Sequence, residues 1–160
     1  MNAVLERKEL SDYEKERGKP MPSRQHGLVQ MQLGGQWITN SDFQVQSEVT
    51  LELAERPNLT PDLSVFPRKT IDWRHDEIRV SEPPIMVVEI LSPTQGSFEL
   101  MQRIDRYFNH GVKSCWVVYP TSRSLTIYTA EGSEKTVTVD DKTATDPATG
   151  LTADLGIVFS

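Results

Sequence analysis

Two apolar stretches separated by an amphipathic segment dominate the hydrophobic pattern of this chain. Residues 85–91 (IMVVEIL) and 115–119 (CWVVY) are apolar on both faces of a strand, which is typical of central strands in a covered sheet. Between them, apolar residues recur every four positions from Leu100 to Phe108, which predicts a helix over residues 97–110. The order strand, helix, strand predicts a βαβ unit.

Shorter patterns flank this unit. Residues 3–17 predict a charged helix that ends at Gly18, and residues 26–33 fit either a helix or a strand before a turn at Gly34-Gly35. The other expected segments are strands over 43–53 (with a polar interruption at Ser47), 62–66, 125–128 and 136–139, an exposed charged loop over 67–82, and an apolar final segment over 151–159. Because the strands before the βαβ unit can be antiparallel, we predict an α/β fold with a mixed central β-sheet flanked by helices.

Length and composition are those of one globular domain spanning residues 1–160. Hydrophobic residues make up 37% of the chain and charged residues 25%. No apolar run approaches the ~20 residues that cross a bilayer, and the charged N-terminus does not resemble a secretory signal. The only cysteine, Cys115, has no partner for an internal disulfide. We therefore expect a cytoplasmic protein that does not associate with membranes.

The net charge of −6 argues against broad electrostatic binding of nucleic acid, so any such binding requires a local basic surface. Residues 14–26 contain four basic and two acidic side chains. The basic ones are Lys15, Arg17, Lys19 and Arg24. This segment is a candidate for contacts with backbone phosphates, which need charge and no sequence readout. The alternative is an ordinary solvated loop.

One carboxylate interrupts the apolar stretch 85–91. Glu89 shares its strand face with apolar neighbours, and burying an isolated ionised carboxylate costs several kcal/mol, so it must be protonated, paired or bound to a cation. Asp62 opens a neighbouring predicted strand, and two such carboxylates can share a hard divalent cation that activates water against a phosphodiester. The alternatives are a turn or cap role for Asp62, and an edge position or a basic partner for Glu89.

Several motifs in this order resemble a known family. Pro61-Asp62 is followed by "VVEILSP" and "RIDRYFNHGVKSCWVVYP", with "ERGKPMPSRQHG" before them and "DPATGLTADLGIVF" after them. This combination resembles the bacterial "putative restriction endonuclease" family within the PD-(D/E)XK nuclease superfamily. The similarity extends roughly from Tyr13 to Phe159.

The resemblance implies a restriction-endonuclease-like fold with a site for Mg²⁺ or Mn²⁺. Asp62 and Glu89 match the family's two metal-binding carboxylates, and the backbone carbonyl of Ile90 is the expected third ligand. Glu14 matches an acidic residue of the N-terminal helix that holds a water molecule or a second ion; the alternative is a solvated helix residue. His26 matches a histidine often found in the family and is expected near the site, although a local hydrogen bond explains it equally well.

The chain departs from the superfamily pattern at its lysine. The superfamily places lysine two residues after the second carboxylate, where this chain has Leu91. The family instead usually carries it four residues before the tyrosine of the following helix, and counting back from Tyr107 gives Arg103. An arginine can offset negative charge on a phosphate but cannot act as a base. The alternative for Arg103 is a helix ion pair with Glu99.

Two functions follow from these features. The first is a metal-dependent endonuclease that hydrolyses DNA phosphodiester bonds, with Arg103 offsetting developing negative charge. The second is a catalytically inactive domain that keeps the nuclease fold and binds DNA or a protein partner. Because a small domain with one site must pair to cut both strands of DNA, we expect a C2 homodimer.

Overall fold

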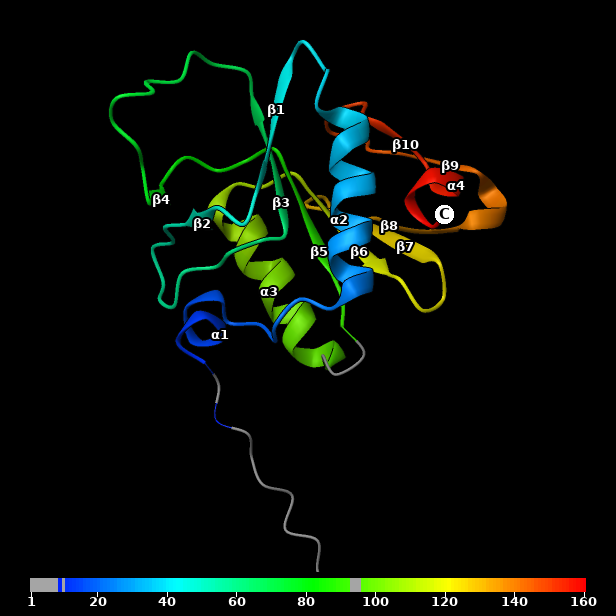
Figure 1. Cartoon of the computed structure of the whole chain (residues 1–160), viewed down its shortest axis with the longest axis horizontal. Coiled ribbons are helices and arrows are strands. Elements are labelled where there is room, and N and C mark those ends of the chain that lie inside the picture. Colours follow the sequence, from blue (N-terminus) through cyan, green and yellow to red (C-terminus); the bar gives the residue numbers. More distant parts are fainter. Residues whose placement is uncertain (1–8, 10, 93–95) are drawn as a thin grey trace, which may run out of the picture.

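The computed structural model describes residues 9, 11–92 and 96–160, and its centre is a six-stranded mixed sheet (Figure 1). The strands are β1 (Phe43–Ser47), β3 (Leu63–Pro67), β5 (Met86–Ile90), β6 (Ser114–Tyr119), β7 (Ser124–Thr129) and β8 (Glu134–Thr138), hydrogen-bonded in that order. Only β5 and β6 run parallel; the other neighbours are antiparallel. The predicted mixed α/β architecture is confirmed.

The predicted βαβ unit forms the middle of the fold. Helix α3 (Ser97–His110) connects β5 to β6, as the four-residue apolar spacing indicated. It ends at Gly111, whose φ of +112° is a left-handed conformation that glycine adopts without strain. Both strands are buried along nearly their whole length, which explains why neither shows an alternating pattern.

Helices cover both faces of the sheet. Helix α2 (Arg24–Trp37) packs on the face that receives Met86, Val88 and Ile90 of β5. Helix α3 packs on the opposite face, with Val87. Because side chains alternate along a strand, Glu89 points to the α3 face. The C-terminal strands β9 (Thr143–Thr145) and β10 (Thr152–Asp154) and helix α4 (Leu155–Val158) join the α2 side, where α4 and α2 are in contact (Figure 1).

Two predicted element boundaries on the N-terminal side are wrong. Helix α1 spans Asp12–Arg17 and begins after Ser11, whose side chain accepts from the N–H of Glu14 in a capping box; the rest of the predicted start, residues 3–8 and 10, lies outside the described residues. Gly34 and Gly35 form no turn and lie inside α2. A Cβ on Gly34 would lie 3.3 Å from Cδ2 of Leu63, so this glycine allows close packing of the helix on the sheet.

The predicted strand over 43–53 is interrupted at the position after Ser47. Glu48 has a φ of +56°, which ends β1 and directs the chain into the short strand β2 (Thr50–Leu51). Strand β2 pairs in parallel with β4 (Arg79–Val80), which lies within the expected loop over 67–82. The interruption places the Glu48 side chain beside the carboxylates considered below.

The remaining predictions for the C-terminal half agree with the structure. Strands β7 and β8 form an antiparallel hairpin, and the final apolar segment becomes β10 and α4. A short 3₁₀ turn, η1 (Val139–Asp141), connects β8 to β9. Within the described residues, no helix has the length and apolar character needed to span a membrane.

Candidate active site

Antiparallel pairing of β3 and β5 brings the two predicted carboxylates together. Asp62 immediately precedes β3 and Glu89 lies near the end of β5. Because these inner strands are antiparallel, both residues lie at the same end of the sheet. The N–H of Asp62 donates to the carbonyl of Val88 at 3.0 Å, which extends the ladder to this point. Both carboxylates are buried, with exposed fractions of 0% and 1%. Burial of Glu89 confirms the interpretation that its strand is covered on both faces.

Four donors surround the Asp62 carboxylate. Its Oδ1 lies 2.6 Å from Nη2 of Arg17, 2.8 Å from Nζ of Lys19 and 2.9 Å from Nε2 of His26. Its Oδ2 accepts from the backbone N–H of Ile90 at 2.6 Å. Burial alone would raise the pKa of Asp62, but the Lys19 ammonium, His26 and the Ile90 N–H outweigh it and lower that pKa strongly. Asp62 is therefore an anion throughout the neutral pH range.

Glu89 is held by three side chains on the α3 face. Its Oε2 lies 3.0 Å from Nζ of Lys19, while its Oε1 accepts from Nε of Arg103 at 3.2 Å and from the Tyr107 hydroxyl. Burial and the Glu89 charge raise the pKa of Tyr107 well above its usual value, so this phenol stays protonated and donates. Burial opposes the charge on Arg103, but Glu89 overcomes that effect and raises the guanidinium pKa.

The end of α1 delivers two of these cations from the N-terminal side. Gly18 ends the helix with a φ of +67°, and the following residue, Lys19, enters the site. Arg17 is fixed by a fork of hydrogen bonds to Glu48, with Nε at 2.8 Å from Oε2 and Nη2 at 2.9 Å from Oε1, and by donation from Nη1 to the carbonyl of Pro20 at 2.8 Å. The segment between α1 and α2 is thereby attached to the sheet edge.

Among the described residues this cluster contains equal numbers of carboxylates and of lysine or arginine cations. Three carboxylates (Glu48, Asp62 and Glu89) face three cations (Arg17, Lys19 and Arg103). Oxygens of the two buried carboxylates converge on one ammonium, so the site is built to share a cation between them. Within the described residues no three His, Cys, Asp or Glu side chains cluster as metal ligands. Mg²⁺ needs only one or two carboxylates, since waters and substrate phosphates complete its shell, and the residues present therefore fit such an ion.

Arg103 carries one donor that has no partner among the described residues. This donor is its buried Nη2, and the side chain lines a small cavity of about 80 Å³ together with Gly18, Glu89, Gly96 and Glu99. Within the described residues Arg103 pairs with Glu89, and no ion pair joins it to Glu99, so the helix ion pair considered as an alternative does not form. A guanidinium with a free donor beside a carboxylate suits an anionic ligand such as a phosphate oxygen.

Three other predicted site residues, Glu14, Arg24 and Ile90, have contacts that do not test their predicted roles. Glu14 binds the N–H and hydroxyl of Ser11 through Oε2 and the N–H of Met21 through Oε1, so these contacts hold the α1–α2 segment in place. Arg24 is exposed at the first position of α2. Ile90 contributes its N–H to Asp62. A role of Glu14, Arg24 or the Ile90 carbonyl in binding an ion or substrate stays a prediction.

Two members of the cluster were not identified as site residues from the sequence. Glu48 forms the paired contact with Arg17, and its signal was the polar interruption of the apolar alternation beginning at Ser47. Tyr107 served in the sequence to locate Arg103 and was given no role of its own, yet its hydroxyl donates to Glu89. A tyrosine on a core-facing helix stripe needs a partner for its hydroxyl, and a carboxylate in the adjacent strand is one available partner.

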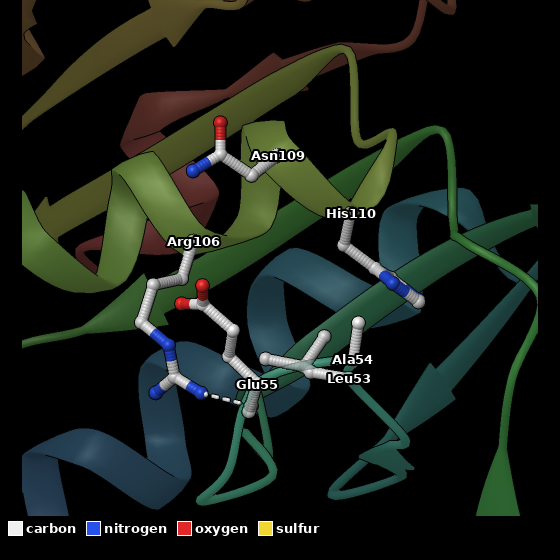
Figure 2. Close-up of a pocket in the computed structure, with 6 residues that line it drawn as sticks. All are labelled: Leu53, Ala54, Glu55, Arg106, Asn109 and His110. Carbon is white, nitrogen blue, oxygen red and sulfur yellow. Dashed lines mark hydrogen bonds between the residues drawn. The ribbon is translucent and has the colours of Figure 1, made fainter.

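A second hollow of about 380 Å³ lies between the C-terminal half of α3 and the segment after β2 (Figure 2). Arg106 points from the helix towards Glu55 and donates to the carbonyls of Glu55, at 2.8 Å, and Pro57. These contacts attach the turn after β2 to α3. The carboxylates of Asp62 and Glu89 do not line this hollow, so the candidate site and the hollow are separate features of the helix surface.

Comparison with known proteins adds two findings. A family model described as "Uma2: Putative restriction endonuclease" matches residues 5–156. The crystal structure of "a putative nuclease belonging to DUF820" from Anabaena variabilis resembles this chain with a TM-score of 0.72 and 20% identity, over 88% of this chain and 83% of that one. At this identity the structural likeness shows a shared fold alone. No curated protein matches the chain.

Proposed function

Because this chain belongs to the Uma2 family, described as putative restriction endonucleases, we propose that it is a divalent-metal-dependent endonuclease that hydrolyses DNA phosphodiester bonds. One observation carries the proposal: oxygens of Asp62 and Glu89 lie 2.8 and 3.0 Å from the same ammonium nitrogen of Lys19. Two buried carboxylates that converge on one cation offer the oxygen ligands that a shared Mg²⁺ or Mn²⁺ takes.

The chain's own groups have distinct tasks in this proposal. Asp62 and Glu89 would hold the ion, with the carbonyl of Ile90 as the expected third protein ligand. When bound, Mg²⁺ or Mn²⁺ supplies Lewis-acid polarisation of a phosphoryl oxygen. The strongly lowered pKa of Asp62 keeps that carboxylate available as an anion without competition from protons at neutral pH. The Ile90 N–H fixes the orientation of the Asp62 carboxylate through its other oxygen.

Arg103 supplies positive charge to the substrate. Its Nη2 donor is buried and without a partner, so a phosphate oxygen in the adjoining cavity would satisfy it. The guanidinium remains protonated at all working pH values and offsets charge on the phosphate without exchanging a proton. Arg24 at the exposed start of α2 and His26, whose Nδ1 is also buried without a partner, are further candidates for contacts with the DNA backbone.

Plasmid cleavage tests this function. Supercoiled plasmid is incubated with the protein and Mn²⁺ or Mg²⁺, and the wild type is compared with Asp62→Asn, Glu89→Gln and the control Asp105→Asn, which removes an exposed carboxylate from α3. The proposal expects nicking by the wild type and the control only, with all variants folded by circular dichroism. Absence of wild-type cleavage with either ion, or cleavage that survives both site substitutions, would contradict it.

We also propose that the active form is a C2 homodimer, because one site per chain cuts one strand at a time. Light scattering at micromolar concentration is expected to give a mass near twice the 18.1 kDa of the chain. A monomer under those conditions would rule this part out.

A second candidate is a catalytically inactive nuclease-fold domain that binds DNA or a protein partner. The observation in its favour is the balance of three carboxylates by three cations, which compensates the buried charges without a metal ion. Fluorescence anisotropy with a labelled duplex separates the two functions. Binding in the presence of EDTA by a protein that does not cleave with Mn²⁺ would favour the inactive domain.

A further inference from the structure

Lys19 is the best-placed cation in the cluster for both carboxylates at once. Its Nζ lies 2.8 Å from Oδ1 of Asp62 and 3.0 Å from Oε2 of Glu89, and its side chain is only 2% exposed. Arg17 reaches Asp62 but is not paired with Glu89, and Arg103 reaches Glu89 alone. Lys19 is therefore the bridge that compensates both buried charges in this structure.

A divalent ion would need the same two oxygens. Mg²⁺ sits about 2.1 Å from its oxygen ligands, so an ion that bridges Asp62 and Glu89 would take the space that the Lys19 nitrogen fills. The ammonium carries a positive charge of its own, and two cations held against one pair of oxygens in a buried site repel strongly. Among the described residues three carboxylates already face three lysine or arginine cations here, so a divalent ion would add uncompensated positive charge unless a cation leaves. Occupancy by Lys19 and by the ion are mutually exclusive.

We propose that Lys19 is the resident cation of the metal-free site, and that a divalent ion binds by displacing its ammonium from between Asp62 and Glu89. This inference rests on the metal site of the proposed function. It adds that ion affinity is set by competition within the chain, and that loading the site releases the Lys19 side chain.

Lys19 can leave the carboxylates while the neighbouring contacts of Arg17 stay in place. Gly18 turns the chain in the left-handed region, with a φ of +67°, and a glycine there changes conformation at little cost. The neighbouring Arg17 keeps its fork to Glu48 and its contact with Pro20, which involve neither oxygen needed by the ion. Among the described residues the Lys19 ammonium donates to the two carboxylates alone, whereas the Arg17 guanidinium also donates to Glu48 and to the carbonyl of Pro20. Lys19 is accordingly the cation that leaves.

Calorimetric titration with Mn²⁺ tests the competition. The wild type is compared with Lys19→Gln, which removes the charge, with Lys19→Arg, which keeps it, and with the control Lys135→Gln on the exposed part of β8. Lys19→Gln is expected to bind Mn²⁺ at least about tenfold more tightly than the wild type, within the usual range of coupling between two sites. Lys19→Arg and Lys135→Gln are expected to stay close to the wild type, and Asp62→Asn to lose binding.

The outcomes separate this inference from the proposed function. Equal affinities of the wild type and Lys19→Gln, both dependent on Asp62, would overturn the competition and leave a metal-dependent endonuclease standing. Binding by Lys19→Gln alone would support the competition and count against metal-dependent cleavage by the wild type. Failure of both proteins to bind Mn²⁺ would overturn both proposals.

A second measurement uses the wild type and does not depend on the folding of a variant. Acetylation by an amine-reactive N-hydroxysuccinimide ester is followed at each lysine by mass spectrometry. Lys19 is expected to be protected without Mn²⁺ and to react several-fold faster once the site is saturated, while the exposed Lys113 and Lys135 react equally in both states. An unchanged rate at Lys19 in the saturated protein would overturn displacement.

Discussion

Two buried aspartates in this fold have opposite kinds of surroundings. Asp62 and Asp146 are both 0% exposed. Asp62 is contacted by two cations and a histidine that come from the α1–α2 region of the chain. Asp146 accepts from neutral donors: Nε1 of Trp116 at 2.9 Å, and the N–H groups of Ala148 and Thr149 within its own turn.

The difference indicates what each carboxylate is for. The donors of Asp146 are the indole N–H of Trp116 and the backbone and hydroxyl groups of its own turn, all of them neutral, so this carboxylate attaches the turn to β6. Asp62 instead gathers cations beside a second buried carboxylate. Neutral donors are typical of a structural aspartate, whereas a buried carboxylate whose pKa is strongly shifted by charged partners is typical of a functional site.

Exchanging each aspartate for asparagine should separate the two roles most clearly. Asp62→Asn removes one ligand of the proposed metal site, and we expect plasmid cleavage to fall by about 10³-fold, comparable with the loss of a key electrostatic group in other enzymes. In Asp146→Asn we expect cleavage to remain within a few-fold of the wild type. Initial nicking rates with Mn²⁺ at equal concentrations of folded protein measure both effects. Similar losses in the two variants would remove the distinction between them.

Substitution of Asp146 should lower the stability of the fold and leave ion binding unchanged. Asp146→Ala leaves the buried Trp116 N–H and two backbone N–H groups of the turn without their acceptor, and each such group costs roughly 1–3 kcal/mol. We expect the free energy of unfolding to fall by about 3 kcal/mol in urea denaturation, with the Mn²⁺ affinity of the folded protein unchanged. A weakened Mn²⁺ affinity in this variant would show that the turn and the site are coupled.

The sequence predicted the carboxylates of the site better than their partners. Glu89 could be identified because an ionisable group within a fully apolar strand must be compensated, and its strand is covered on both faces as expected. Asp62 followed from the order of motifs. Lys19 and Arg17 were expected to face DNA phosphates, yet their charged ends lie on Asp62 in this structure. The pairing depends on how α1 docks on the sheet edge, which no local pattern specifies.

The role of Asp146 was equally beyond the local pattern. The motif Thr145-Asp146-Pro147 followed by Gly150 predicts a turn, but not that the aspartate is buried. Its burial comes from Trp116, which is thirty positions away and reaches it only once β6 occupies the centre of the sheet. The βαβ unit could be predicted because the apolar patterns of its strands and helix lie within one continuous segment of the sequence.

The pH dependence of the free energy of unfolding should show that Asp62 is charged in the folded protein. Although burial raises its pKa, Lys19 and His26 lower it strongly overall, so the folded protein favours the anion. A lowered pKa gives stability that is fully present above the ordinary value near 3.8 and is lost as the pH falls through the folded value. The difference in unfolding free energy between wild type and Asp62→Asn should be flat above about pH 5 and decrease below pH 4, by at most about 1.4 kcal/mol per pH unit.

Urea titrations of both proteins between pH 3 and 7 measure this difference, and Asp105→Asn serves as the control on the exposed face of α3. A difference that grows as the pH falls would mean that Asp62 is stabilised in its protonated form, which would contradict the ion-pair cluster around it.

The smallest expected effect isolates one neutral donor of the structural aspartate. The hydroxyl of Thr149 donates to Oδ2 of Asp146 at 2.9 Å, and that oxygen also accepts from two backbone N–H groups. Thr149→Ala should therefore lower the free energy of unfolding by only about 1 kcal/mol, since the carboxylate keeps its other donors, and Thr149→Ser should recover most of that loss. Thermal and urea denaturation measure both variants. An equal loss in Thr149→Ser would assign the effect to the methyl group and its packing. Recovery in Thr149→Ser would assign the effect to the hydroxyl, so that neutral hydrogen bonds hold Asp146 where cations hold Asp62.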